Sequence, residues 1–160
     1  MNRITIYICA AIFFLLPLPS VQGAMVKLSL EQLTQDADLV ILGTVEGVES
    51  ELVTGKIFSF ATISVKSKIK GELEATQNKI IIKFPGGTVG DRAMKVEDSP
   101  GYKKGEKVLI FLRKIQNQPY YRTVGASQGR FLIKNHIVLK ENTSLDQFLE
   151  KIQSIMHSLD

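Results

Sequence analysis

The segment Gly125-Ala126-Ser127-Gln128-Gly129 matches G-x-S-x-G, the nucleophile elbow of many serine hydrolases. In that elbow a strand precedes the serine and a helix follows it, so that the hydroxyl stands beside an oxyanion hole. The residues that follow here, Arg130-Phe131-Leu132-Ile133, have the composition of a strand. The pattern therefore predicts a glycine-rich turn between two strands, and we expect no catalytic residues and no enzymatic activity.

Metal-binding residue types are scarce. His136 and His157 are the only histidines and Cys9 is the only cysteine, which is too few for a typical zinc or copper site. Asp91, Glu97 and Asp98 could supply oxygen ligands to calcium, but their spacing does not fit an EF-hand. We favour a solvated acidic loop over a calcium site, and we predict neither a metal nor a cofactor.

A long loop is expected at residues 85–105, which hold five of the twelve glycines and two of the five prolines. Its start is glycine-rich but lacks the lysine and the helix of a phosphate-binding loop. The loop either closes one end of the domain or borders a binding surface. Tyrosine and arginine dominate binding hot spots, so the candidate contacts on such a surface are Arg92, Tyr102, Tyr120, Tyr121 and Arg122.

The N-terminus has the pattern of a secretory signal peptide. Arg3 precedes an apolar run over residues 4–18, and Val21-Gln22-Gly23 places small residues at −3 and −1 of a cut before Ala24. The run is shorter than the roughly 20 apolar residues that span a bilayer. We therefore expect cleavage of residues 1–23 and an extracytoplasmic location, periplasmic or secreted, with no stable membrane span; an uncleaved anchor is the alternative.

Composition fits one globular domain over residues 24–160. The chain has 44% hydrophobic and 22% charged residues, and its formal net charge of +4 falls to +3 when Arg3 leaves with the signal. This small positive excess, together with export, argues against a nucleic-acid partner. Because Cys9 lies in the signal, the mature domain has no thiol and depends on its apolar core alone.

Short strands dominate the expected secondary structure. Alternating or continuous apolar residues predict strands at 39–48, 58–70, 79–84, 107–113, 120–124, 130–133 and 137–139, with a loop at 49–56 and a hairpin tip at Asn135-His136. The run Val108 to Leu112 is apolar throughout, which indicates a central strand. This order predicts an antiparallel, mainly β closed barrel or sandwich.

Two helices flank these strands. Capping boxes, Ser29 with Gln32 and Ser144 with Gln147, predict a short helix after residue 29 and a longer one at the C-terminus. The longer helix carries an apolar stripe that we expect to pack on the sheet. Membrane or partner binding through the stripe is the alternative, which its non-basic polar face disfavours.

Several segments resemble a group of exported bacterial proteins of unknown function. The similarity is carried by residues 36–45, 68–72, 84–87 and 101–112, within a region of about residues 29–133. The same succession resembles, more distantly, the netrin-like domain of tissue inhibitors of metalloproteinases, at Ala37-Asp38-Leu39-Val40, Lys70-Gly71 and Gly105-Glu106-Lys107-Val108. That resemblance implies a small antiparallel OB-like barrel with a short N-terminal and a C-terminal amphipathic helix.

The inhibitory mechanism of the netrin-like family does not carry over to this chain. It requires an N-terminal cysteine that chelates the zinc of the target, whereas the expected mature chain starts at Ala24 and has no cysteine. The leading hypothesis is an exported, non-enzymatic module that binds a protein or a cell-envelope component through the 85–105 loop and adjacent strand ends. The alternative is a protease-inhibitor-like protein with another mechanism.

Cleavage of the signal gives a direct prediction. When the full chain is produced in an exporting bacterium, we expect intact-mass measurement of the extracytoplasmic protein to place its first residue at Ala24. Gly23→Arg puts a large charge at −1 and should block processing, whereas Gln22→Ala at the unconstrained −2 position should not. A mature protein that keeps Met1 would contradict the prediction.

Overall fold

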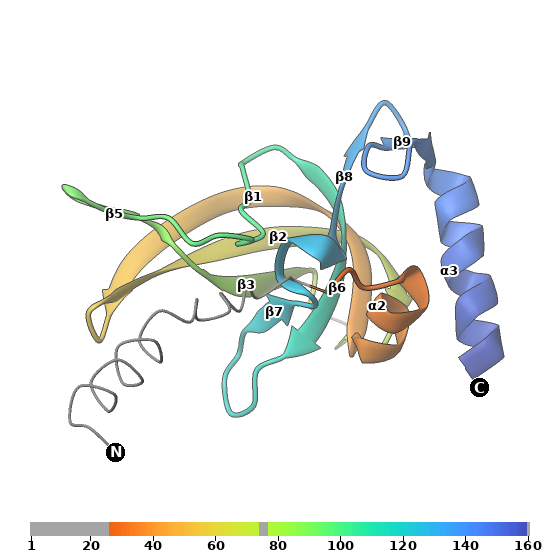
Figure 1. Cartoon of the computed structure of the whole chain (residues 1–160), viewed down its shortest axis with the longest axis horizontal. Helices are drawn as coiled ribbons and strands as arrows, with labels where there is room; N and C mark the ends of the chain where they lie inside the picture. Colours follow the sequence, from red (N-terminus) through yellow and green to blue (C-terminus); the bar gives the residue numbers. More distant parts are fainter. Residues whose placement is uncertain (1–25, 74–76, 160) are drawn as a thin grey trace, which may run out of the picture.

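The computed structural model describes residues 26–73 and 77–159, and the expected signal peptide lies outside these residues (Figure 1). The fold is mainly β, with two α-helices, as predicted. The elements are α2 (Leu30–Asp36), β1 (Leu39–Val53), β2 (Lys56–Lys70), β3 (Lys79–Pro85), β4 (Gly87–Val89), β5 (Arg92–Met94), β6 (Lys107–Lys114), β7 (Tyr121–Thr123), the 3-10 helix η1 (Ala126–Gly129), β8 (Arg130–Lys134), β9 (Ile137–Val138), β10 (Thr143–Ser144) and α3 (Leu145–Leu159).

Five strands form a closed ring. Their order is β1, β2, β3, β7 and β6, and β6 pairs with β1 again. All of these pairs are antiparallel except β3 with β7, which run parallel where Ile82 faces Tyr121. The prediction of a purely antiparallel arrangement is wrong at this pair, because β4, β5 and β6 intervene in the chain and bring β7 beside β3 in the same direction.

Two apolar clusters lie on opposite sides of β1 and β6. Leu39 and Ile41 of β1 point into the ring, whereas Val40 and Leu42 face the helices. The residues of β6 alternate in the same way, and Val108 to Leu112 are all 0% exposed. Burial of both faces explains the continuous apolar runs of these strands, and it confirms the predicted central position of β6.

Close packing requires glycine where β1 curls around the ring. A Cβ at residue 43 would lie 2.6 Å from the Ile63 Cγ2 and 2.7 Å from the Ser64 carbonyl oxygen. The β1–β2 register also shifts between Leu42 and Gly43 and between Val45 and Gly47. The pairing of β1 with β2 is therefore irregular next to both glycines, as it is at β-bulges.

Two expected loops contain strands instead. The expected loop at 49–56 belongs to a long hairpin, in which β1 and β2 are joined by a tight turn at Thr54 and Gly55, with φ of 47° and 81°. Positive φ at both residues suits the right-handed twist of a hairpin. The 85–105 segment holds the β4–β5 hairpin. Both hairpins extend to the side of the molecule opposite α3 (Figure 1).

Both helices pack as their sequences predict. Ser29 and Gln32 form the complete capping box at the start of α2. At the start of α3 the Ser144 hydroxyl accepts a hydrogen bond from the Gln147 N–H, at 3.3 Å. Leu145, Phe148 and Ile152 of α3 belong to the cluster between the helices and the sheet. Among the described residues, no helix has the length and apolar character needed to cross a membrane.

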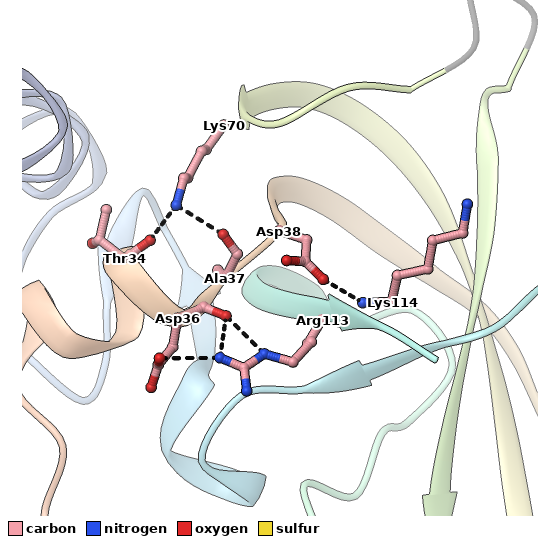
Figure 2. A network of polar contacts seen from close by, with 7 residues as sticks. All are labelled: Thr34, Asp36, Ala37, Asp38, Lys70, Arg113 and Lys114. Atoms are coloured by element: carbon pink, nitrogen blue, oxygen red, sulfur yellow. Dashed lines mark hydrogen bonds and ion pairs between the residues drawn. The ribbon is translucent and has the colours of Figure 1, made fainter. Parts of the chain in front are cut away.

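The C-terminal end of α2 is held by basic side chains from two ring strands (Figure 2). The Lys70 ammonium of β2 donates to the carbonyl oxygens of Thr34 and Ala37, at 2.6 and 2.8 Å. Arg113 of β6 donates through Nε and Nη2 to the Asp36 carbonyl oxygen, at 3.0 and 2.7 Å. The last carbonyl groups at the C-terminal end of a helix have no intrahelical donor, and a cation placed there also interacts favourably with the helix dipole. These contacts therefore fasten α2 to the ring.

Loss of this fastening should lower stability. We expect Lys70→Met to reduce the free energy of unfolding by about 2 kcal/mol, because two part-buried carbonyls lose a charged donor. Lys68→Met removes an exposed lysine from the same strand and should change the free energy of unfolding by less than about 0.5 kcal/mol. Urea denaturation followed by circular dichroism measures both, and equal effects would show that the Lys70 contacts add no stability.

Candidate binding face and pocket

The five residues predicted to bind do not share one surface. Arg92 lies exposed on β5. Tyr120 directly precedes β7 and is half-buried, whereas Arg122 lies within β7 and is exposed. Tyr102 and Tyr121 are only 6% and 8% exposed and belong to the core inside the ring, so their prediction as surface contacts is wrong.

Tyr102 fills an end of the ring. Its ring lies 5.4 Å from that of Phe84, between centroids, and the Arg130 guanidinium lies 5.3 Å from its centroid. Its hydroxyl shares a 2.7 Å hydrogen bond with the Thr123 Oγ1. Burial raises the pKa of Tyr102 well above its usual value, while the Thr123 hydrogen bond and Arg130 partly oppose that shift. A long segment with many glycines thus places a core residue, which composition alone could not reveal.

Aromatic rings instead gather on the outer face of β2, β3 and β7. We define the aromatic strip as Phe58, Phe60, Lys83 and Tyr120, all of them half-buried. The Lys83 ammonium lies 4.8 Å from the ring centroid of Phe58 and 5.7 Å from that of Phe60. Phe60 and Tyr120 meet edge to face, with centroids 5.1 Å apart. The strip is therefore a continuous contact surface with a cation held among its rings.

Strand alternation places these side chains outside the ring. Their neighbours Ala61, Ile82 and Tyr121 point inward and are buried. Phe60 lies opposite Lys83 across β2 and β3, and opposite Glu49 across β1 and β2. A hollow of about 290 Å³ beside the strip is lined by Glu49, Ser50, Glu51, Phe60, Thr62, Ile81 and Tyr120. The strip therefore has an acidic border on β1.

A pocket of about 410 Å³ opens next to the strip, between the 96–100 segment and the ends of β3 and β7. Ser127 N–H donates to the Asp98 carbonyl oxygen at 2.9 Å, and the Ser99 hydroxyl donates to the Pro85 carbonyl oxygen at 2.8 Å. These two bonds hold the 96–100 wall against the rest of the domain. Lys83 lines the pocket as well as belonging to the strip, so the two features share a cation.

The charged side chains of the pocket divide into a paired and an unpaired set. Arg113 is committed to Asp36, with Nη2 3.0 Å from its carboxylate and two bonds to its carbonyl oxygen. Within residues 26–73 and 77–159, neither Arg122 nor Glu97 has an ion-pair or side-chain hydrogen-bond partner. The pocket thus presents free charges of both signs.

The serine motif sits in a turn, as predicted. Ser127 lies in η1 between β7 and β8, so a strand rather than a helix follows it. His136 is exposed on the hairpin tip, where its Nε2 lies 2.9 Å from the Asp146 carboxylate. In the part of the chain that the structure describes, no three His, Cys, Asp or Glu side chains gather as a metal site would require.

Sequence reasoning named Tyr120 but missed Phe58, Phe60 and Lys83 of the strip. Phe58 and Phe60 share the outward face of β2 with Thr62 and Ser64, because side chains alternate along a strand. Two large rings on an otherwise polar face were a readable signal. The sequence could not show that Tyr120 lies beside Phe60, because their contact depends on the parallel pairing of β3 with β7.

No protein-family model matches the chain, and a search of curated proteins also gives no match. The functional argument therefore rests on the geometry of the described residues.

The buried Tyr102 hydroxyl predicts a pH dependence of stability. Because its pKa is raised in the folded state, its stabilising contribution is present below the unfolded value near 10 and is lost as pH rises beyond it. Tyr102→Phe should cost about 1 kcal/mol at pH 7 by leaving Thr123 unpaired, and should lose less stability than the wild type above pH 10.

The half-buried Tyr120 offers the matched control. Tyr120→Phe should leave both the stability at pH 7 and its alkaline loss close to those of the wild type. Denaturant unfolding at a series of pH values measures all three proteins. Identical pH profiles for Tyr102→Phe and the wild type would contradict the assignment.

Proposed function

We propose that this protein is an extracytoplasmic, non-enzymatic binding module with an OB-like barrel, which contacts a protein or cell-envelope component through the aromatic strip. The observation that carries the proposal is the cluster of half-buried rings around the Lys83 ammonium. The signal pattern of residues 1–23 supports the location.

The strand order supports an OB-like barrel. Counted in chain order, the ring runs first, second, third, fifth, fourth and back to the first strand. A five-stranded, partly open Greek-key barrel is the architecture of OB folds, which bind ligands on the face of their second and third strands. Here those strands are β2 and β3, which carry Phe58, Phe60 and Lys83.

The chemistry of the strip supports recognition of a partner with anionic groups beside apolar ones. Rings supply contact area at a small cost in side-chain entropy, and they are enriched in binding hot spots. The lysine between them is available to an anion, because no carboxylate among the described residues lies within ion-pair distance of it. Replacing the lysine with an acid would put like charge against such a partner.

Site-specific photocrosslinking tests this face. A benzophenone amino acid at position 60 or 120 should give a discrete adduct in producing cells, identifiable by mass spectrometry, whereas position 153 on the exposed side of α3 should not. Lys83→Glu should reduce the position-60 adduct at least fivefold. Lys66→Glu makes the same charge change on β2 away from the strip and should leave the yield of the position-60 adduct unchanged. Equal labelling from all three positions would overturn the proposal.

A further inference from the structure

The pocket beside the strip has a chemistry of its own, distinct from that of the strip. We propose that it binds a small zwitterion with an apolar side chain, namely a free amino acid or a dipeptide whose two charged ends are intact. This inference goes beyond the proposed function, since the strip can bind a partner whether or not the pocket is filled.

Size restricts the occupant. Ligand pockets range over about 300–1,000 Å³, and this one holds about 410 Å³. It therefore suits one or two amino-acid residues rather than a polymer.

One wall is cationic. Because β3 and β7 run parallel where Ile82 faces Tyr121, the next residues, Lys83 and Arg122, lie side by side on the outer face. Arg122 is exposed and unpaired within the described residues, whereas the neighbouring Arg113 is neutralised by Asp36. A free guanidinium offers a planar pair of donors, which matches a carboxylate. The ligand's carboxylate belongs at this wall.

The facing wall is acidic. Glu97 and Asp98 lie on the 96–100 segment, which the bonds from Ser127 and Ser99 hold in place. Asp98 adopts a φ of 59°, a conformation that costs energy outside glycine and that this anchoring maintains. The carboxylate of Glu97 has no cationic partner among the described residues. An ammonium group belongs at this wall.

Charge balance then favours a zwitterion over a simple anion. The three basic side chains that line the pocket, Lys83, Arg113 and Arg122, equal in number the three acidic ones, Asp36, Glu97 and Asp98. A ligand with net charge would therefore be repelled by one wall as strongly as it is attracted by the other. A neutral ligand with separated charges satisfies both.

Apolar groups line the space between the walls. Phe84, Pro100 and Val124 are buried residues of the lining, and Leu28 lies beside them. Burial of an aliphatic ligand side chain against these residues removes apolar surface from water, which stabilises the complex. The side chain of the occupant is therefore aliphatic or aromatic rather than polar.

Titration with a free dipeptide and with its capped derivatives tests the proposal. The probe is L-leucyl-L-leucine, added to the ¹⁵N-labelled mature protein and followed by NMR shifts of Val124, Gly125 and Ala126. We expect saturable binding with a dissociation constant on the order of 1 mM or tighter. N-acetylation or C-terminal amidation should each weaken binding at least tenfold, because each removes one of the two charges.

Variants localise the binding. Arg122→Gln and Glu97→Gln should each weaken it at least fivefold, whereas Arg92→Gln removes an exposed arginine outside the pocket and should not. Absence of saturable shifts up to about 10 mM dipeptide, equal binding of the doubly capped peptide, or full binding by both pocket variants would overturn the proposal. Phe60→Ala should abolish crosslinking through the strip but leave dipeptide binding intact, which separates failure of this proposal from failure of the proposed function.

Discussion

Residues 40–44 of β1 are paired along both edges, with β2 and with β6, and the strand is packed on both faces. One edge continues the ring and the other closes it, so the two apolar clusters and both neighbouring strands meet on this short stretch. Both candidate binding features are positioned through this stretch. The aromatic strip lies on β2 and β3, which follow β1 in the order of the ring. The pocket forms where β7 pairs with β3.

Three of the four segments that carried the sequence resemblance, residues 36–45, 68–72 and 101–112, meet beside the same stretch. Lys70 donates to the Ala37 carbonyl oxygen, and a Cβ at Gly71 would lie 2.1 Å from the Asp38 carbonyl oxygen. Gly105 donates its N–H to the Val45 carbonyl oxygen at 2.8 Å. These residues are needed to join α2, β1, β2 and β6. Such motifs therefore carry information about architecture, and the four residues of the aromatic strip lie outside them.

Local patterns predicted most of the fold because each pattern had a local cause. Burial on both faces makes Val108 to Leu112 apolar, and the Ser29 capping box begins α2. The predictions failed where the cause was distant. Residues 49–53 were predicted to be loop because their mostly polar sequence does not reveal that they pair with β2. Tyr102 was predicted to be a surface contact, but this residue of an expected loop packs inside the ring. The candidate pocket shows the same division: Arg122 was found from its residue type, but its position in one pocket with the 96–100 wall could be seen only in the folded chain.

Burial of β1 and β6 on both faces has a consequence for folding. In a half-buried strand, a slip of one residue turns apolar side chains to water and is strongly penalised. Here such a slip would exchange one apolar set for another, so hydrophobicity alone cannot choose the alignment. Polar bonds at the strand ends distinguish the alignments. Asp38 N–H donates to the Leu112 carbonyl oxygen at 2.8 Å, and Lys114 N–H donates to the Asp38 carboxylate, also at 2.8 Å (Figure 2). The two bonds of Asp38 thus favour the observed register of β1 and β6, which burial of apolar side chains alone would not distinguish from a shifted one.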